Sequence, residues 1–151
     1  MIHPLIEQSI CANIKELMIE ADNVANVIST HTLNNALLIL TQVKYSWIPV
    51  LSPKSKLLGL INMSGIINGV TTLDSIEMER LDELKVADIE LTEAPTVTED
   101  TSLERILQLL TDYNFVCMVS AENIFMGIIT RRTLLKKLVH LLHNLDELIQ
   151  F

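Results

Sequence analysis

Two stretches of this chain carry the same pattern of residues, and this internal repeat is the strongest constraint on its fold. Residues at the start of the second stretch lie 70 positions after their counterparts in the first, and residues further on lie 68 positions after theirs. The second stretch has therefore lost two residues after its first helix. The matching residues are Val27, His31 and Leu33 with Val97, Thr101 and Leu103, and then Trp47, Pro49 and Gly59 with Phe115, Cys117 and Gly127. Self-similarity at a fixed period indicates two copies of one supersecondary unit, neither of which can bury its apolar helices alone.

Each copy has the pattern strand, helix, strand, strand, helix. In the first copy we expect strands at residues 24–28, 47–51 and 57–61 and helices at residues 33–44 and 64–70. Thr32 is the expected N-cap of the first helix. The chain is therefore predicted to have an α/β fold in which two tandem repeats pack as a pseudo-two-fold pair.

Further segments flank the two repeats. Apolar residues at helical spacing predict an N-terminal helix at residues 3–21, with Pro4 in its first turn. Between the repeats we expect an acidic helical connector whose apolar residues face inward, namely Ile76, Leu81, Leu84, Val86 and Ile89. The predicted organisation is residues 1–22 for the N-terminal helix, 23–72 for repeat one, 73–92 for the connector, 93–140 for repeat two and 141–151 for a C-terminal tail.

The composition limits the possible classes of function. The net charge is −8 at pH 7, which argues against general nucleic-acid binding because that needs a basic face. No apolar run approaches the roughly 20 residues of a membrane span, and residues 1–4 lack the cationic region of a secretory signal. Cys11 and Cys117 show no metal-binding or redox spacing, which favours buried free thiols in a soluble cytoplasmic protein. A hydrophobic content of 49% with only 20% charged residues suggests that a second subunit covers part of the surface, as in a homodimer.

A short basic stretch stands where the last predicted strand of repeat two enters its helix. Arg131 and Arg132 follow Thr130, which could add a hydroxyl contact, and Lys136 and Lys137 come one turn later. A helix N-terminus presents unpaired backbone N–H groups and the positive end of the helix dipole, and guanidinium groups bind phosphate oxygens in pairs. The pattern indicates an anion site, and the competing interpretation is a pair of solvated arginines.

The corresponding positions of repeat one lack this charge. Asn62, Met63, Ser64 and Gly65 stand where repeat two has Thr130, Arg131, Arg132 and Thr133. A methionine and a serine cannot replace two guanidinium groups as partners of an anion. We therefore expect one competent anion site per chain.

The repeat resembles the CBS domain, and the pair resembles a tandem CBS (Bateman) module. The resemblance covers about residues 15–140 and rests on the segments YSWIPVLSPKSKLLGLI and FVCMVSAENIFMGIITRRTLL. The segments MIEADNVANV, SWIPVL, LDELKVADIEL and GIITRR look more specifically like the small stand-alone CBS proteins of Firmicutes that bind cyclic di-AMP. Members of that group are non-enzymatic dimers that sense the dinucleotide and bind target proteins, including the stringent-response synthetase/hydrolase and pyruvate carboxylase.

The resemblance implies that this chain is a regulatory sensor that binds cyclic di-AMP between its repeats and controls a partner protein. Family sites for mononucleotides hold the ribose with the Asp of a Thr-x-x-Asp motif, but this position is Thr133 in repeat two and Gly65 in repeat one. The departure favours a ligand held mainly by its phosphates. The alternatives are a sensor of AMP, ADP or ATP and a structural CBS interaction module that binds no ligand.

The resemblance also places ligand contacts at the first strand of repeat one. Asn23, Val24 and Ala25 enter this strand, and the small Ala25 leaves room for a base to meet backbone N–H and C=O groups. Repeat two has Pro95 at the matching position, which removes one backbone donor. In the cyclic di-AMP group a lysine is expected at position 23, so Asn23 removes one charge from the phosphate side.

Tyr45, Ser46 and Trp47 precede the Pro-Val strand of repeat one, where the family places adenine and ribose contacts. Ser46 could donate its hydroxyl, and Tyr45 or Trp47 could stack on a base. Trp47 is equally compatible with a position in the core or in a dimer interface. The predicted ligand residues are therefore these three together with residues 23–25 and 130–132.

Weaker candidates lie elsewhere in the chain. His140, His143 and Glu147 share a helix face and could hold a metal ion, but the apolar residues around them favour packing against another subunit. The acidic residues of the connector form either a solvated face or a docking surface for a basic partner, and they are Glu77, Glu79, Asp82, Glu83, Asp88 and Glu90. No nucleophile is paired with a base in a catalytic arrangement, so we expect neither enzymatic activity nor a cofactor.

Overall fold

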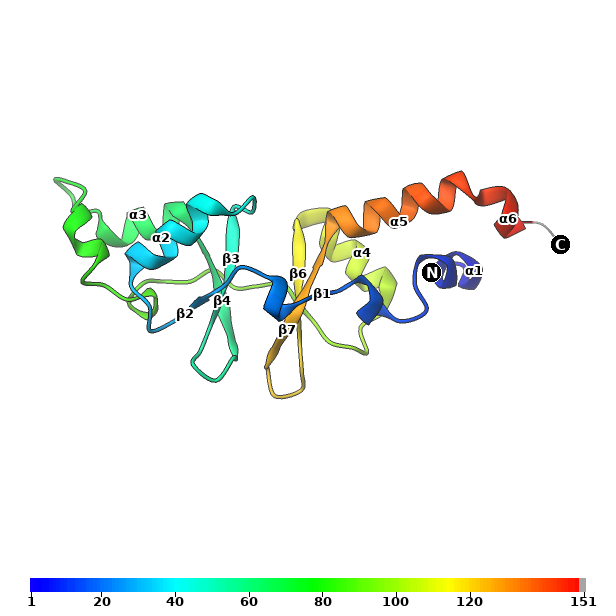
Figure 1. Cartoon of the computed structure of the whole chain (residues 1–151), viewed down its shortest axis with the longest axis horizontal. Helices are drawn as coiled ribbons and strands as arrows, with labels where there is room; N and C mark the ends of the chain where they lie inside the picture. The colour runs from blue at the N-terminus through cyan, green and yellow to red at the C-terminus, as the bar shows by residue number, and fades with distance from the viewer. Residues whose placement is uncertain (150–151) are drawn as a thin grey trace. The chain divides into compact units, whose positions relative to one another are not determined.

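The computed structural model describes residues 1–149 and divides the chain into two compact units (Figure 1). Unit 1 contains Met1–Ala21, Pro95–Ala121 and the residues from Met126 onward, and unit 2 contains Asp22–Ala94 and Glu122–Phe125. Repeat one therefore lies in unit 2, whereas most of repeat two shares unit 1 with the N-terminal segment. Among the described residues, no helix combines the length and the apolar character needed to cross a membrane.

Unit 2 contains a three-stranded sheet in the order β2-β3-β4. Its regular elements are β2 (Val27–Ile28), α2 (Leu33–Gln42), β3 (Trp47–Leu51), β4 (Leu57–Asn62) and α3 (Met63–Val70). β2 runs parallel to β3, and β3 runs antiparallel to β4. The sheet and both helices share one apolar core, whose fully buried members include Val27, Leu33, Ala36, Val50 and Ile66.

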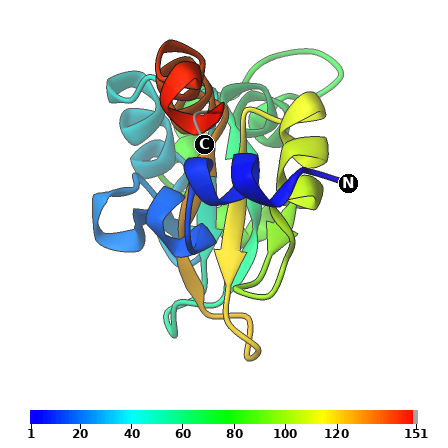
Figure 2. The same cartoon turned by 90° about the vertical axis from the view of Figure 1, so that its right-hand side faces the viewer.

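Unit 1 contains a four-stranded sheet in the order β1-β7-β6-β5. Its elements are α1 (Pro4–Ile10), β1 (Ile19–Glu20), β5 (Thr96–Val97), α4 (Leu103–Asp112), β6 (Phe115–Val119), β7 (Phe125–Thr130), α5 (Arg131–His143) and α6 (Leu145–Ile149). The first residue of β7, Phe125, is assigned to unit 2. β1 pairs antiparallel with β7, so a strand from the N-terminal segment extends the sheet of repeat two. α1 contacts α5, and Figure 2 shows α1 in front of the strands of this sheet. The predicted tail at residues 141–151 begins inside α5, and its last two residues lie outside the described residues.

The element boundaries confirm the repeat predicted from the sequence. α4 begins and ends 70 residues after α2, and β6 and β7 begin and end 68 residues after β3 and β4. The helix caps also correspond, because Thr32 Oγ1 accepts from Asn35 N at 3.1 Å and Ser102 Oγ accepts from Arg105 N at 3.2 Å. A side-chain oxygen at this position satisfies one of the free N–H groups at the start of each helix.

Gly59 and Gly127 occupy matching positions in the two repeats. Gly59 allows one neighbouring segment to pass close to β4, and Gly127 allows another to pass close to β7. A Cβ atom on Gly59 would lie 2.8 Å from the carbonyl oxygen of Thr92, and one on Gly127 would overlap the carbonyl oxygen of Ile19. Both neighbouring segments are paired with these strands: Thr92 exchanges backbone hydrogen bonds with Leu60 at 2.7 and 3.0 Å, and β1 pairs with β7. Glycine is needed at both positions because a larger residue would displace the paired segment.

The prediction of one helix over residues 3–21 is wrong beyond Ile10. α1 ends there, Cys11 is extended, and a separate 3-10 helix follows at Ile14–Leu17. Asn13 caps this second helix, since its Oδ1 accepts from Lys15 N at 2.9 Å. A short polar side chain that bonds its own backbone competes with the continuation of an α-helix.

The connector is not the regular helix that the sequence suggested. It contains two 3-10 helices, Met78–Leu81 and Val86–Asp88. Leu81 and Val86 are buried in the core of unit 2 as predicted, whereas Ile76 is 54% exposed instead of facing inward. Asp88 Oδ2 accepts from Lys85 N at 2.8 Å, a local bond that favours a turn over a continuous helix.

Candidate functional site

The junction between β7 and α5 begins with a helix cap. Thr130 is 5% exposed, and its Oγ1 accepts from the backbone N of Thr133 at 3.1 Å. The same oxygen lies 3.0 Å from Thr133 Oγ1. An N-cap oxygen of this kind stabilises the start of a helix. The Thr130 hydroxyl, which the sequence suggested as a ligand contact, is therefore occupied by hydrogen bonds within unit 1.

The guanidinium of Arg131 lies on the C-terminal end of α4. Its Nε donates to the carbonyl of Leu110 at 2.8 Å, and its Nη2 donates to the carbonyls of Thr111 and Tyr113 at 3.3 and 3.2 Å. The last carbonyls of a helix lack partners within the helix and form the negative end of its dipole, so a cation is favourable there. Arg131 thus ties the start of α5 to the end of α4. Of its five N–H donors, the two on Nη1 have no partner within residues 1–149.

Arg132 is placed differently, although it follows directly in the chain. Its side chain is exposed, and within residues 1–149 it makes no hydrogen bond or ion pair. It is the second residue of α5, whose first turn contains no acidic residue. A cation at the positive end of a helix dipole is unfavourable by about 0.3–1 kcal/mol on a surface. Arg132 therefore lowers the stability of the fold slightly and leaves its guanidinium available, next to a helix N-terminus, for an anion.

The β4–α3 junction of repeat one has an equivalent cap and a different surface. Asn62 Oδ1 accepts from Gly65 N at 2.8 Å, as Thr130 does for Thr133 in repeat two. A pocket of about 360 Å³ opens beside this cap, lined by Leu40, Val43, Lys44, Tyr45, Ser46, Asn62, Met63 and Ser64. The structure thus brings Tyr45 and Ser46 of the predicted site together with the uncharged junction of repeat one.

Ala25 has a free backbone edge that its counterpart in repeat two lacks. In unit 1 the carbonyl of Pro95 accepts from Cys117 N at 2.8 Å, which extends the pairing of β5 with β6. The equivalent donor is missing in unit 2, because Pro49 has no N–H. β2 therefore begins at Val27 and not at residue 24 as predicted, and within residues 1–149 nothing bonds to the backbone of Ala25. The N–H and the C=O of Ala25 are both available to the edge of a base.

The other predicted contacts in unit 2 differ in exposure. Asn23 is exposed at the end of a 3-10 helix, whereas Val24 is buried and its carbonyl accepts from Asn26 Nδ2 at 2.9 Å. Trp47 is half-buried at the start of β3. These residues belong to unit 2, and the basic junction belongs to unit 1. The prediction that a single ligand contacts both groups stays a prediction.

Reasoning from the sequence missed Tyr113 and Asn114, which adjoin the basic junction. Both are exposed, and their backbone carbonyls accept from Nη2 and from the backbone N of Arg131 at 3.2 and 2.8 Å. They stand 68 positions after Tyr45 and Ser46, so the repeat itself carried the signal that could have found them. An exposed tyrosine next to a basic helix start can provide a stacking surface for a base.

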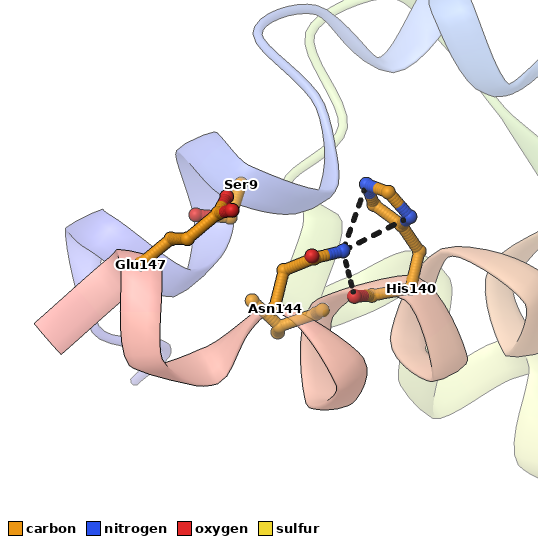
Figure 3. A pocket seen from close by; sticks show the side chains of 5 residues that line it. Ser9, His140, Asn144 and Glu147 are labelled. Carbon is orange, nitrogen blue, oxygen red and sulfur yellow. Dashed lines mark hydrogen bonds between the residues drawn. The ribbon is translucent and has the colours of Figure 1, made fainter.

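The metal site considered for α5 is not assembled in the described residues. Figure 3 shows a pocket of about 310 Å³ lined by Ser9, His140, Leu141, Asn144 and Glu147. His140 is engaged by Asn144, whose Nδ2 donates to the His140 carbonyl at 2.9 Å and lies 3.3 Å from its Nδ1. Figure 3 shows the Glu147 side chain apart from the His140 ring, with Asn144 drawn between them. Across residues 1–149, no three His, Cys, Asp or Glu side chains gather closely enough to hold a metal ion.

Cys11 and Cys117 are free and buried, as predicted. Burial raises the pKa of Cys117 to about 12, so this thiol stays protonated near neutral pH. The pKa of Cys11 is raised by burial and, to a smaller extent, by the carboxylates of Glu16 and Glu7. Because the thiolate is the reactive form, neither cysteine is suited to nucleophilic catalysis.

Two sequence comparisons match this chain to known proteins. The family model of the CBS domain matches residues 86–140. The chain is also 37% identical over 141 residues to cyclic di-AMP receptor B of Bacillus subtilis, and this alignment covers 93% of the chain and 96% of that protein.

Solved structures give the same match at the level of the fold. CbpB of Listeria monocytogenes in complex with c-di-AMP is 42% identical, with a TM-score of 0.77, and the match covers 86% of this chain and 97% of that chain. CbpB from Streptococcus agalactiae is 27% identical, with a TM-score of 0.85, and the match covers 99% of this chain and 94% of that chain.

Proposed function

This chain belongs to the family of CBS-domain proteins that includes cyclic di-AMP receptor B of Bacillus subtilis, and on that premise we propose that it is a receptor for cyclic di-AMP without catalytic activity. The proposal is supported by the relatives' names and by their level of identity, 37% for the Bacillus subtilis receptor and 42% for the Listeria monocytogenes complex with c-di-AMP. The raised pKa values of both buried thiols also disfavour cysteine chemistry.

The placement of Arg132 is the single observation that supports an anionic ligand most strongly. Natural helices favour acidic residues in the first turn, because these complement the dipole. α5 has none there and instead places an exposed arginine without a partner among residues 1–149. A cyclic dinucleotide carries two phosphodiester anions, and a guanidinium at a helix N-terminus fits one of them by charge and by hydrogen-bond geometry.

The proposed ligand residues divide by role, and they are Asn23, Val24, Ala25, Tyr45, Ser46, Trp47, Thr130, Arg131 and Arg132. Arg132 binds a phosphate. Ala25 pairs with an adenine edge through its free N–H and C=O, while Tyr45, Ser46 and Trp47 contact base and ribose. Thr130 and Arg131 act mainly by holding the junction in place, since most of their polar atoms are engaged within unit 1.

The ligand is proposed to be a dinucleotide and not AMP, ADP or ATP. A mononucleotide site of this family would hold the ribose hydroxyls with an aspartate, and the two candidate positions are Gly65 and Thr133. Without that carboxylate, binding depends on the phosphates and on the bases. Asn23 supplies no charge, so phosphate binding depends more on Arg132 than it would with a lysine at position 23.

We also propose that the protein is a homodimer. Leu135, Val139 and Leu142 are 53%, 53% and 68% exposed and follow one another at helical spacing along one face of α5. An apolar helix face of this kind favours contact with a second copy of the same surface. Sedimentation velocity on a Leu142→Glu variant tests this, because the homodimer should dissociate into monomers.

The proposed biological role is to regulate a target protein by binding it in a ligand-dependent manner. We place this role in the cytoplasm, where free thiols such as those of this chain stay reduced. Regulation requires that the target bind the nucleotide-loaded and nucleotide-free states with different affinity. The family resemblance makes the stringent-response synthetase/hydrolase and pyruvate carboxylase the first targets to test.

A thermal-shift experiment tests the ligand. A nucleotide that binds only the folded state raises stability by mass action, by about 2.7 kcal/mol at one hundred times its Kd. Cyclic di-AMP should raise the Tm, and AMP, ATP and cyclic di-GMP should raise it less. Arg132→Met should abolish the shift, whereas Arg105→Met should retain it. Arg105 is the matched control because it is also an exposed arginine in the first turn of a helix of unit 1.

A larger shift with AMP or ATP would favour the mononucleotide sensor. No shift with any nucleotide would favour the structural CBS module and contradict the proposed function.

A further inference from the structure

The segment that follows α3, residues 71–78, is a short loop that ends at the first residue of the 3-10 helix Met78–Leu81, and we call it the Leu73 loop. Glu77 N donates to the carbonyl of Val70 at 2.8 Å and closes the loop at its base. Thr72 N donates to Ser75 O at 2.8 Å, and Thr72 Oγ1 accepts from Ser75 N at 3.1 Å. These bonds stabilise the loop, which extends beyond the C-terminal end of α3 (Figure 1).

Three apolar side chains of the Leu73 loop face solvent. Leu73 is fully exposed, and Ile76 and Met78 are 54% and 50% exposed. Single exposed apolar residues are normal on a protein surface, but three within six residues concentrate exposed apolar area in one short segment. Leu81, three residues after Met78, is buried in the core of unit 2, so the loop is anchored at its far end as well.

The same part of the chain is acidic. Residues 71–83 contain five carboxylates and one cation, namely Asp74, Glu77, Glu79, Asp82, Glu83 and Arg80. Arg80 lies 3.8 Å from Glu77 and therefore offsets only that carboxylate at close range. Asp74, Glu79, Asp82 and Glu83 are all exposed. The loop thus combines apolar side chains with an uncompensated negative charge.

We propose that the Leu73 loop is the docking surface for a cationic amphipathic segment of a partner protein. Leu73, Ile76 and Met78 pack against the apolar face of this segment, and the surrounding carboxylates pair with its lysine or arginine residues. Charge complementarity of this kind speeds association and selects the partner, while buried apolar anchors supply most of the affinity. The inference rests on the proposed function in one respect, since the regulated target would be this partner.

The charge pattern disfavours two other occupants. A second copy of the loop would place like charges against each other, which costs binding energy. An anionic membrane surface would repel the same carboxylates. A cationic amphipathic segment satisfies both the apolar and the electrostatic requirement.

Fluorescence anisotropy with a defined probe tests the inference. The probe is a labelled amphipathic helix built only of leucine and lysine, and its control is the same design with glutamate in place of lysine. The chain should bind the lysine probe saturably and the glutamate probe at least about tenfold more weakly. Raising the salt concentration should weaken binding of the lysine probe, because exposed charges are screened beyond a Debye length.

Matched variants locate the binding surface. Leu73→Ser and Met78→Ser should each weaken binding of the lysine probe by about tenfold. Leu38→Ser should leave it unchanged, since Leu38 is 53% exposed on α2 of the same unit. Glu79→Gln combined with Glu83→Gln should reduce the salt dependence. All of these residues are exposed, so the variants are expected to fold.

Equal losses for Leu73→Ser and Leu38→Ser, or equal binding of both probes, would overturn the inference. A change of oligomeric state in Leu73→Ser would also overturn it, because the loop would then be an interface between copies of this chain. The cyclic di-AMP thermal shift, measured on the same variants, should be unaffected, so failure of the docking inference is distinguishable from failure of the proposed function.

Discussion

The two strand-to-helix junctions of this molecule begin with equivalent helix caps, but one junction is uncharged and the other is basic. At the β4–α3 junction Asn62 caps the helix, and at the β7–α5 junction Thr130 does so, each by accepting a bond from the third residue of the helix at 2.8 or 3.1 Å. The first two helical residues are Met63 and Ser64 in one case and two arginines in the other. The helix caps therefore match between the repeats, whereas the charge at the start of the helix does not.

The difference also separates two arginines that look alike in the sequence. Arg131 is bound to three carbonyls at the end of α4, while Arg132 has no partner within residues 1–149. One arginine of the pair stabilises unit 1, and the other is retained where the helix dipole disfavours it. Because Arg132 lowers the stability of the fold whereas Arg131 raises it, Arg132 is the stronger candidate for a functional residue.

Reversing the charge of Arg132 should have the largest effect. Arg132→Glu should lower the affinity for cyclic di-AMP by about 100-fold or more, because it removes a charged hydrogen bond and adds repulsion. It should also raise the stability of the nucleotide-free protein by about 0.5 kcal/mol, since the carboxylate complements the dipole of α5. Calorimetry and chemical denaturation measure the two effects. Arg105→Glu is the control, with a similar gain in stability and unchanged affinity.

Adding a methyl group to the matched glycines should affect stability next most strongly. Gly127→Ala should cost about 3 kcal/mol and Gly59→Ala about 1–2 kcal/mol, because the new Cβ overlaps the Ile19 carbonyl in the first case and approaches the Thr92 carbonyl at 2.8 Å in the second. Urea denaturation gives both values. Equal stability of Gly127→Ala and the unmodified chain would contradict the close pairing of β1 with β7.

Removing the cap on α4 should have a moderate effect. Arg131→Gln should cost about 1–2 kcal/mol of stability, since the carbonyls of Leu110, Thr111 and Tyr113 lose their partner. The affinity for cyclic di-AMP should fall less than in Arg132→Met. A variant that keeps its stability but loses all binding would show instead that Arg131 is a direct ligand contact.

Restoring a charge at position 23 should have the smallest effect. Asn23 is exposed, so Asn23→Lys is tolerated by the fold and should raise the affinity for cyclic di-AMP about threefold to tenfold, by adding one cation on the phosphate side. Titration at low and moderate salt checks this, because the gain should shrink as the salt concentration rises. An unchanged affinity at low salt would place residue 23 away from the phosphates.

The repeat made much of this fold predictable from the sequence. The central strands and helices follow from local patterns: Thr32 caps α2, and β3 occupies its predicted range. Local patterns failed where a polar side chain changed the backbone path, as Asn13 did after α1 and Asp88 did in the connector. The pairing of β1 with β7 joins residues more than 100 positions apart, and no local pattern encodes it.

The sequence identified most residues of the candidate site, but it did not reveal the role of each one. Arg131 and Arg132 were indistinguishable in the sequence, because the contact that separates them reaches 21 residues back to Leu110. The free backbone of Ala25 depended on the missing N–H of Pro49, a neighbour on another strand. Tyr113 and Asn114 were accessible through the repeat offset, since they match Tyr45 and Ser46.

Titration calorimetry with cyclic di-AMP tests the central claim most directly, namely that only the charged junction makes a competent site. The unmodified chain should bind one nucleotide per chain, Arg105→Met should do the same, and Arg132→Met should show no heat of binding at the same concentrations. Two equivalent nucleotides per chain, or undiminished binding by Arg132→Met, would contradict the account.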